Sequence, residues 1–405
     1  MVQRPSSTPV FILAGGEGAR LSPLTEAKPK PAVSFGGTHQ ILDFTLSNCI
    51  NSGLRKIFVL TQYQREPLHD YVREIRHRIS PSQDWREGDE LRSVPPVSGK
   101  RYRGTADAVF QNLPLIRFDT VEHVLIASGD HVYSMDYRPL ISRHIASGAD
   151  LTIAAARRPV KESGAFGVVD VEGGMVTRFR EKPSSDTLPQ HGEVLVSMGV
   201  YVFNRRALLN IADSATPMET DFGHDILPRL VRGQKVAAYD FGSSPRNYWR
   251  DVGSLDSYFQ ANMDLLGAGS EFHPEMDSGW PVYALGDSST LKYGDSRVSR
   301  RAVIGRSTIR RSVISHGACI EPGALVENSV ILPGARVGRS ARVRNTILAE
   351  GASIPDDFKV GMNLNLDRSR FMVTPGGVVV IKASRHRTYE RTTLANRRQP
   401  APTAA

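Results

Sequence analysis

Residues 10–21 read VFILAGGEGARL, and this stretch decides the fold of the first part of the chain. The apolar run Val10–Ala14 predicts a buried strand, followed at once by Gly15, Gly16 and Gly18. Without side chains, these glycines let backbone N–H groups point at a polyphosphate, and Arg20 and Lys30 add positive charge. A plain glycine turn is the alternative, and the stretch matches neither the Walker loop nor the strict dinucleotide fingerprint. We interpret it as a triphosphate-binding loop.

Strand-like and helix-like segments alternate from this loop to residue 266. Strands are predicted at Val10–Ala14, Lys56–Thr61, His123–Ser128, Leu151–Ala156 and Val194–Phe203, and helices at Ile41–Ser52, Tyr137–Ser147 and Ser254–Leu266. This alternation predicts an α/β fold with a Rossmann-like sheet, which binds ligands at the carboxyl ends of its strands. Gln62 and Asp130 follow two such ends, so we expect them in one cleft with the glycine loop.

A different pattern begins at Val303 and Ile309. Aliphatic residues recur there at steps of six and five, so that the register repeats every seventeen residues, as at Ile314, Ile331 and Leu348. Three short sides per coil, each with one inward aliphatic side chain, predict a hexapeptide-repeat left-handed β-helix. An antiparallel meander would instead show strict alternation over longer strands.

The 405 residues therefore divide into four parts. We predict an α/β domain over 1–266, a linker rich in Gly, Ser, Asp and Pro over 267–290, a β-helix domain over 291–382, and a basic, flexible tail over 383–405.

Composition narrows the possible functions. The net charge of +9 lies partly in the tail, and motifs for nucleic-acid binding are absent, so we expect small anionic ligands rather than nucleic acid. Apolar runs are too short for a membrane span or a signal peptide, so we expect no membrane partner and a cytoplasmic location. The two cysteines, Cys49 and Cys319, fall in different domains and are expected to be small buried residues.

Further segments resemble the sugar-nucleotide pyrophosphorylases and, among them, the glucose-1-phosphate adenylyltransferases. They are ILDFTLSN (41–48), TQY (61–63), YRGTADAV (102–109), SGDHVY (128–133), AFGV (165–168), EKP (181–183), SMGVYVF (197–203) and YWRDVG (248–253). The resemblance implies a nucleotidyltransferase that joins α-D-glucose 1-phosphate to AMP from ATP for glycogen (α-glucan) synthesis. It also implies a homotetramer, with the β-helix serving oligomerisation and the binding of small anionic allosteric effectors.

The resemblance assigns roles to individual residues. Nucleotidyl transfer needs positioning and charge neutralisation rather than a covalent nucleophile. Catalysis is assigned to Arg20, Lys30, Asp130 and Asp251, with the two aspartates as ligands of Mg2+. The ATP site comprises Gly15, Gly16, Gly18, Gln62 and Gly104, and the glucose 1-phosphate site comprises Tyr102, Gly167, Glu181, Lys182 and Ser197. His131 and His316 are expected to be structural.

The chain departs from the family pattern in two places. Ala27, Thr38 and Gln40 stand where members activated by fructose 1,6-bisphosphate often carry basic residues, so the activator and inhibitor stay open. The loop before Tyr102 lacks the family's P-A-Q-Q-R motif, which leaves its nucleotide contacts open.

Three alternative functions remain. They are the same chemistry with UTP, dTTP or GTP, a non-catalytic regulatory subunit, and an acyltransferase activity in the β-helix. The presence of all the basic and acidic catalytic positions argues against a regulatory subunit. His316, the single histidine of the repeat region, argues against an acyltransferase because a second histidine-bearing motif is missing.

Overall fold

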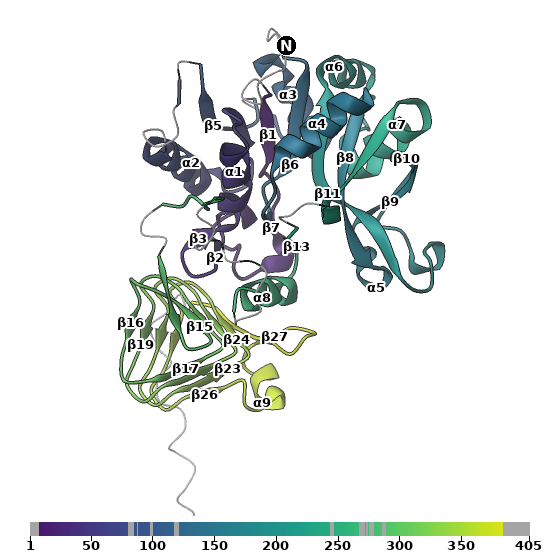
Figure 1. The fold of residues 1–405 in the computed structure, drawn as a ribbon. Helices are drawn as coiled ribbons and strands as arrows, with labels where there is room; N and C mark the ends of the chain where they lie inside the picture. Colours follow the sequence, from purple (N-terminus) through teal and green to yellow (C-terminus); the bar gives the residue numbers. More distant parts are fainter. Residues whose placement is uncertain are drawn as a thin grey trace, which may run out of the picture.

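The computed structural model describes residues 8–79, 85–86, 88–97, 100–116, 121–243, 247–266, 272, 274, 279–285 and 289–383. Figure 1 shows an α/β domain above a β-helix, with helix α8 (Leu255–Met263) lying between them. About half of the predicted linker over 267–290 lies outside the described residues, and the predicted tail lies outside them from residue 384 onward.

The α/β domain is built on a nine-stranded sheet. Its strands, in spatial order, are β5 (Glu90–Val94), β4 (Lys56–Leu60), β1 (Val10–Leu13), β6 (His123–Ser128), β11 (Glu193–Asn204), β8 (Leu151–Pro159), β12 (Val236–Asp240), β10 (Met175–Glu181) and β9 (Gly167–Glu172). The four strands from β5 to β6 run parallel, whereas β11 is antiparallel to β6. The carboxyl ends of β1, β4 and β6 therefore lie side by side. The α/β fold predicted from the sequence is confirmed.

Helices cover both faces of this sheet. Successive residues of β1 point to opposite faces, so Val10 and Ile12 join one buried cluster while Phe11 joins another. The first cluster is closed by α1 (Ile41–Asn51), α2 (Arg65–Ile79) and α4 (Tyr137–Ser147), and the second by α3 (Thr105–Asn112), α6 (Arg205–Ser214) and α7 (Leu227–Gly233). The shorter elements include α5 (Val160–Ser163) and the π-helix η7 (Phe222–Ile226). Two short antiparallel pairs are formed by β2 (Ser34–Phe35) with β3 (His39–Gln40) and by β7 (His131–Tyr133) with β13 (Trp249–Asp251).

The C-terminal part winds three sheets around one core. The first contains β14 (Thr290–Tyr293), β15 (Ser296–Ser299), β18 (Val313–Ile314), β21 (Val330–Ile331), β24 (Thr346–Leu348), β28 (Val379–Ile381) and β27 (Met372–Val373). The second contains β16 (Val303–Ile304), β19 (Cys319–Ile320), β22 (Arg336–Val337) and β25 (Ser353–Ile354). The third contains β17 (Thr308–Arg310), β20 (Leu325–Glu327), β23 (Arg342–Arg344) and β26 (Lys359–Val360), and a short helix, α9 (Leu364–Arg368), follows. Ile314 pairs in parallel with Ile331, and Ile331 with Leu348, which confirms the seventeen-residue register.

Two details of the β-helix differ from the sequence prediction. Val303 does not point inward, since 64% of its surface is exposed, and Ile304 instead pairs with the inward Ile320. The first coil is one residue shorter at this side than the later coils, which shifts the register. Cys319, expected to be buried, is half-buried because Ile320 takes the inward position of β19, whereas Cys49 is fully buried in α1.

One corner of the coils is formed by residues with left-handed backbone. Arg311, Asn328 and Asn345 occupy equivalent positions, with φ values of 43°, 43° and 45°. Asparagine tolerates this conformation better than most residues. The Asn328 amide also donates a hydrogen bond to Asn345 Oδ1 in the next coil. The exposed side chain of Arg311 has no such advantage.

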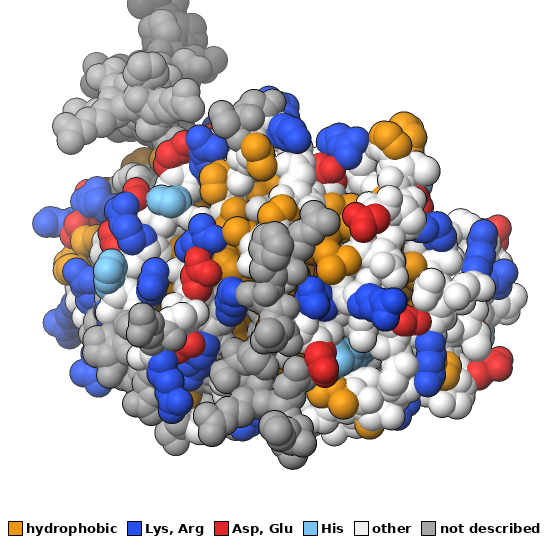
Figure 2. All heavy atoms as spheres, turned by 90° about the horizontal axis from the view of Figure 1, so that it is seen from above, with side chains coloured by type: hydrophobic (Ala, Val, Ile, Leu, Met, Phe, Trp, Pro, Cys, Tyr) orange, Lys and Arg blue, Asp and Glu red, His pale blue; other side chains and the backbone are white. Residues whose placement is uncertain are grey.

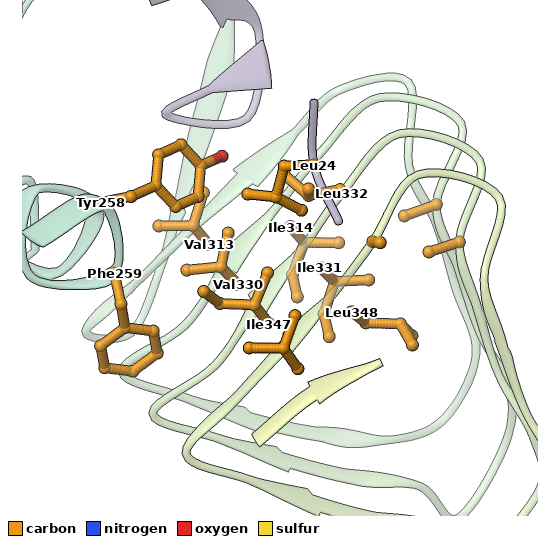
Figure 3. Packing of buried hydrophobic residues seen from close by; sticks show 14 of the residues in the cluster. Leu24, Tyr258, Phe259, Val313, Ile314, Val330, Ile331, Leu332, Ile347 and Leu348 are labelled. Carbon is orange, nitrogen blue, oxygen red and sulfur yellow. The ribbon is translucent and has the colours of Figure 1, made fainter. Parts of the chain in front are cut away.

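The two domains share one apolar core. Tyr258 and Phe259 of α8, together with Leu24, belong to the same buried cluster as the inward aliphatic residues of the β-helix. Figure 3 shows the two aromatic rings beside Val313, Val330 and Ile347, and Leu24 beside Leu332. The backbone of Gly36 adds polar contacts, since its N–H donates to Asn262 Oδ1 at 3.0 Å and its carbonyl accepts from Arg297 Nε at 2.7 Å.

Candidate active site

A cavity of about 550 Å³ opens where β1, β4 and β6 end, and it is lined by the last residue of each strand. Nine of the predicted site residues line it: Gly15, Gly16, Gly18, Arg20, Lys30, Gln62, Tyr102, Gly104 and Asp130. The parallel order of the three strands brings their following loops to one edge of the sheet, which is why residues so distant in sequence meet here.

Gly18 sets the shape of the phosphate loop. Its φ of 67° is left-handed, and its carbonyl accepts a hydrogen bond from Thr25 Oγ1 at 3.1 Å. A Cβ atom at this position would lie 2.9 Å from Lys30 Cβ. Only glycine therefore lets the stem of Lys30 pack against the loop.

Lys30 joins the loop to two carboxylates. It lies in a short 3-10 helix, η3 (Lys30–Ala32), between two prolines that restrict its backbone. Its Nζ lies 2.9 Å from Asp130 Oδ2 and 3.3 Å from Asp251 Oδ1. Burial alone would lower the pKa of the Lys30 ammonium, but attraction to Asp130 and Asp251 outweighs it and raises the pKa. Lys30 is therefore a cation at neutral pH.

The β7–β13 pair holds the two aspartates together. Asp130 directly precedes β7, and Asp251 ends β13 opposite His131. Burial alone would raise the pKa of Asp130, but Lys30 and then His131 outweigh it and hold the pKa well below its usual range. The Asp130 carboxyl is therefore ionised.

These two carboxylates form a donor set that suits a divalent metal. They already converge on one cation, the Lys30 ammonium. In the part of the chain that the structure describes, no group of three or more His, Cys, Asp or Glu could hold a metal by itself. A metal bound here would take its remaining ligands from substrate phosphates and water, as Mg2+ commonly does.

Comparison with known proteins agrees with this geometry. A family model described as nucleotidyl transferase matches residues 10–267. A protein named glucose-1-phosphate adenylyltransferase 2 from Alkalilimnicola ehrlichii is 40% identical over 93% of both chains. One of the same name from Vibrio parahaemolyticus is 42% identical over 92% of this chain and 98% of its own length. The chain belongs to the glucose-1-phosphate adenylyltransferase family.

The β-helix also has a counterpart in these comparisons. A family model described as GlmU-like, C-terminal hexapeptide matches residues 285–381. Together with the parallel coils, this match confirms the hexapeptide-repeat left-handed β-helix predicted from the sequence. A glucose-1-phosphate adenylyltransferase from Methylobacillus flagellatus is 40% identical over 93% of both chains, so the likeness extends across both domains.

Gln62, Tyr102 and Gly104 form the far wall of the adenylyltransferase cavity. The side chain of Gln62 is fixed on the Tyr102 backbone, donating to its carbonyl at 3.2 Å and accepting from its N–H. The Tyr102 hydroxyl, by contrast, is engaged away from the cavity by Val94 and Asn112. The Thr220 carbonyl packs so closely on Gly104 that a Cβ atom there would lie 2.4 Å away.

Four predicted sugar-phosphate residues do not line this cavity: Gly167, Glu181, Lys182 and Ser197. Gly167, Glu181 and Ser197 lie on β9, β10 and β11, and Lys182 directly follows β10. Gly167 pairs with Glu181, and Lys182 Nζ lies 3.3 Å from Glu181 Oε1. The Glu181 carboxylate packs against Gly223, two residues after the cavity-lining Asp221. This group therefore borders the cavity on the Asp221 side.

His131 stands closer to the centre than its sequence role suggests. Trp249 Nε1 donates a hydrogen bond to His131 Nδ1 at 3.3 Å, which leaves Nε2 facing the two aspartates. That Nε2 lies 3.6 Å from Asp130 Oδ1 and 3.7 Å from Asp251 Oδ1. Its place directly after Asp130 in the sequence is the signal that could have drawn attention to it.

The described helices and one face of the surface bear on the predicted partners. None of the helices in the described ranges is long and apolar enough to cross a bilayer. On the face drawn in Figure 2, Lys and Arg side chains are scattered among acidic and hydrophobic ones instead of forming one stripe. That nucleic acid is not a ligand stays a prediction.

Proposed function

We propose that the chain transfers AMP from ATP to α-D-glucose 1-phosphate and releases pyrophosphate, giving ADP-glucose for the synthesis of glycogen or another α-glucan. The observation that carries this proposal is the convergence of the glycine loop, Lys30 and Asp130 in one cavity of an adenylyltransferase-family chain. Its relatives carry the name of this reaction.

Different residues bind the triphosphate, the metal and the sugar phosphate during an in-line displacement at the α-phosphorus. The backbone N–H groups of the loop and the Arg20 guanidinium bind the triphosphate and stabilise the leaving pyrophosphate. Asp130 and Asp251 would hold Mg2+, which would neutralise charge on the phosphate oxygens. Lys182 holds the phosphate of glucose 1-phosphate so that its oxygen faces the α-phosphorus. No covalent intermediate with the protein is required.

The remaining assignments rest on family resemblance. Residues 1–266 carry catalysis, and residues 291–382 serve assembly into a homotetramer and the binding of small anionic effectors. We propose a cytoplasmic location and leave the identity of the effectors open, because Ala27, Thr38 and Gln40 lack the basic groups expected at an activator site.

The test is pyrophosphate release with glucose 1-phosphate and Mg2+, comparing ATP, UTP, dTTP and GTP. Fructose 6-phosphate, fructose 1,6-bisphosphate and pyruvate are added in separate reactions to find the effector. Strong preference for ATP is expected. Preference for another nucleotide would assign a different nucleotide sugar, and no turnover with any of them would favour a regulatory subunit.

A further inference from the structure

The position of the Lys30 ammonium is the starting point. Lys30 Nζ lies within hydrogen-bonding distance of one oxygen from each aspartate, Asp130 Oδ2 and Asp251 Oδ1. The Lys30 side chain is only 8% exposed, so water replaces little of this interaction. The lysine thus neutralises the same two carboxylates that the proposed function assigns to the metal.

We infer that Lys30 occupies, in the nucleotide-free protein, the place between Asp130 and Asp251 that a divalent cation takes when the nucleotide binds. Lysine and metal therefore exclude each other. This inference rests on the proposed function for the nucleotide, but the competition itself concerns only the protein and the metal.

Both distance and charge prevent the Lys30 ammonium and the metal from binding the two carboxylates at the same time. Mg2+ binds carboxylate oxygens at about 2.0–2.1 Å, whereas the ammonium holds the same oxygens at 2.9 and 3.3 Å. Two cations sharing one pair of oxygens would also lie close enough to repel each other strongly. The other oxygen of Asp130, Oδ1, already accepts a hydrogen bond from Ser128 Oγ, so Oδ2 is the Asp130 oxygen that the ammonium and the metal would share.

The triphosphate gives the lysine another partner. Its Cβ already packs against Gly18, and both residues line the cavity of the phosphate loop. Rotation of the four-carbon stem therefore carries Nζ from the aspartates toward phosphates held by the loop, without movement of the proline-flanked backbone. Nucleotide and metal then favour each other's binding by the same factor, because such coupling is reciprocal.

The test is a titration of the full-length protein with Mn2+ alone, followed by the electron paramagnetic resonance signal of free Mn2+. Lys30→Met and Lys30→Gln remove the competing cation, and each is expected to lower the Kd for Mn2+ by at least about tenfold relative to the unmodified protein. Lys161→Met is the control, because Lys161 is an exposed lysine that does not line the cavity. Its Kd should equal that of the unmodified protein.

A second substitution identifies the site. Asp130→Asn added to Lys30→Gln should abolish the tighter binding, whereas Lys30→Arg, which keeps the positive charge, should bind Mn2+ as weakly as the unmodified protein. Circular dichroism checks that each variant is folded, and the glutamine variant serves if the methionine variant is not. Equal or weaker Mn2+ binding in the neutral variants would overturn the inference. Because no substrate is present, that result is distinct from a failure of the proposed function, which is measured by pyrophosphate release.

Discussion

Gly18 is the residue at which the loop and Lys30 are positioned together. We predict that Gly18→Ala lowers kcat/KM for ATP by about 100-fold, because a methyl group 2.9 Å from Lys30 Cβ displaces the lysine and strains a left-handed backbone. Steady-state kinetics measure the loss. Gly16→Ala is the control, because nothing lies within 4 Å of a Cβ atom there and a smaller loss is expected. Equal losses in the two variants would contradict the steric explanation.

Lys182 offers a test of the sugar-phosphate group. Its side chain is 62% exposed, so Lys182→Gln should fold normally. We predict a 10- to 100-fold rise in the KM for glucose 1-phosphate, roughly the value of one charge-assisted phosphate contact, with a smaller change in kcat. Lys161→Gln, a change at another exposed lysine, is the control. An unchanged KM would remove Lys182 from the binding site.

The role of a residue could be predicted from the sequence where local spacing fixes its position, but not where contacts with distant parts of the chain do. The loop glycines and Lys30 could be predicted because their spacing after a strand limits where they can lie. The direction of the Tyr102 hydroxyl could not, since its partner Asn112 is fixed by the packing of α3. The central place of His131 depends on β13, more than a hundred residues later in the chain.

Among the elements, equivalent corners of the β-helix have the same left-handed backbone but carry different residues. Asn328 and Asn345 suit the left-handed corner and bond to each other across two coils, whereas Arg311 adopts the same φ of 43° with a long side chain that favours this conformation less. We predict that Arg311→Asn raises the free energy of unfolding by about 0.5–1 kcal/mol, since asparagine is strained less there. Urea unfolding measures the change. Asn328→Arg should have the opposite effect, and a loss of stability in Arg311→Asn would contradict the argument.

The contact of α4 with β8 makes stability depend on pH. His144 Nδ1 bonds to Thr152 Oγ1 at 2.8 Å, and its ring packs on His123, with ring centroids 4.9 Å apart. Burial, and then the neighbouring His123, lower the pKa of His144 to about 4. Between this value and the unfolded value of about 6.5, only the unfolded chain binds the proton, so stability falls as pH falls.

We therefore predict that the unmodified protein loses about 2 kcal/mol more stability than His144→Asn when the pH is lowered from 7 to 5. Urea unfolding at the two pH values measures the difference. Comparing variants is necessary because Asp43, whose pKa burial raises to about 7, acts in the opposite direction in both proteins. Identical pH dependence of the two proteins would exclude His144 as a source.

The elements themselves were largely predictable, because the period of apolar residues reports which face is buried. The helix at Tyr137–Ser147 has the predicted bounds, and its N-cap Asp136 accepts a hydrogen bond from the Arg138 N–H. Val303 was assigned wrongly because one coil lacks a residue, and a repeat read from later coils does not reveal the shortening of the first.

In the molecule as a whole, the segment between Arg20 and Lys30 is anchored on the β-helix. Lys28 pairs with Glu350, Glu26 lies 3.4 Å from Lys382, and Leu24 packs in the shared core. We predict that Glu350→Lys lowers kcat about 3- to 10-fold, because repulsion displaces the segment that carries both cations of the active site. Stability should change little, since Glu350 is half exposed.

Steady-state kinetics and a charge swap measure this coupling. The double variant Lys28→Glu with Glu350→Lys restores the attraction and should recover most of the turnover. A double variant as slow as the slower single variant would show that the pair does not act through its charges.

Contacts between the domains could not be predicted from the sequence. Gly36 and Arg297 are 261 positions apart, and no local pattern marks them as partners. The motifs predicted the fold of each domain. The contact between the two domains depends on side-chain packing, which only the folded chain defines.

That shared core has a consequence for how such a protein can be shortened or recombined. Tyr258 and Phe259 complete the top of the β-helix as much as they complete the α/β domain. A gene fragment ending after α8 would encode a chain in which the apolar side chains of Tyr258 and Phe259 are exposed to solvent, and this product would tend to aggregate. Chimeras that exchange solenoids between relatives should therefore carry α8 and the loop around Leu24 along with the coils they fit.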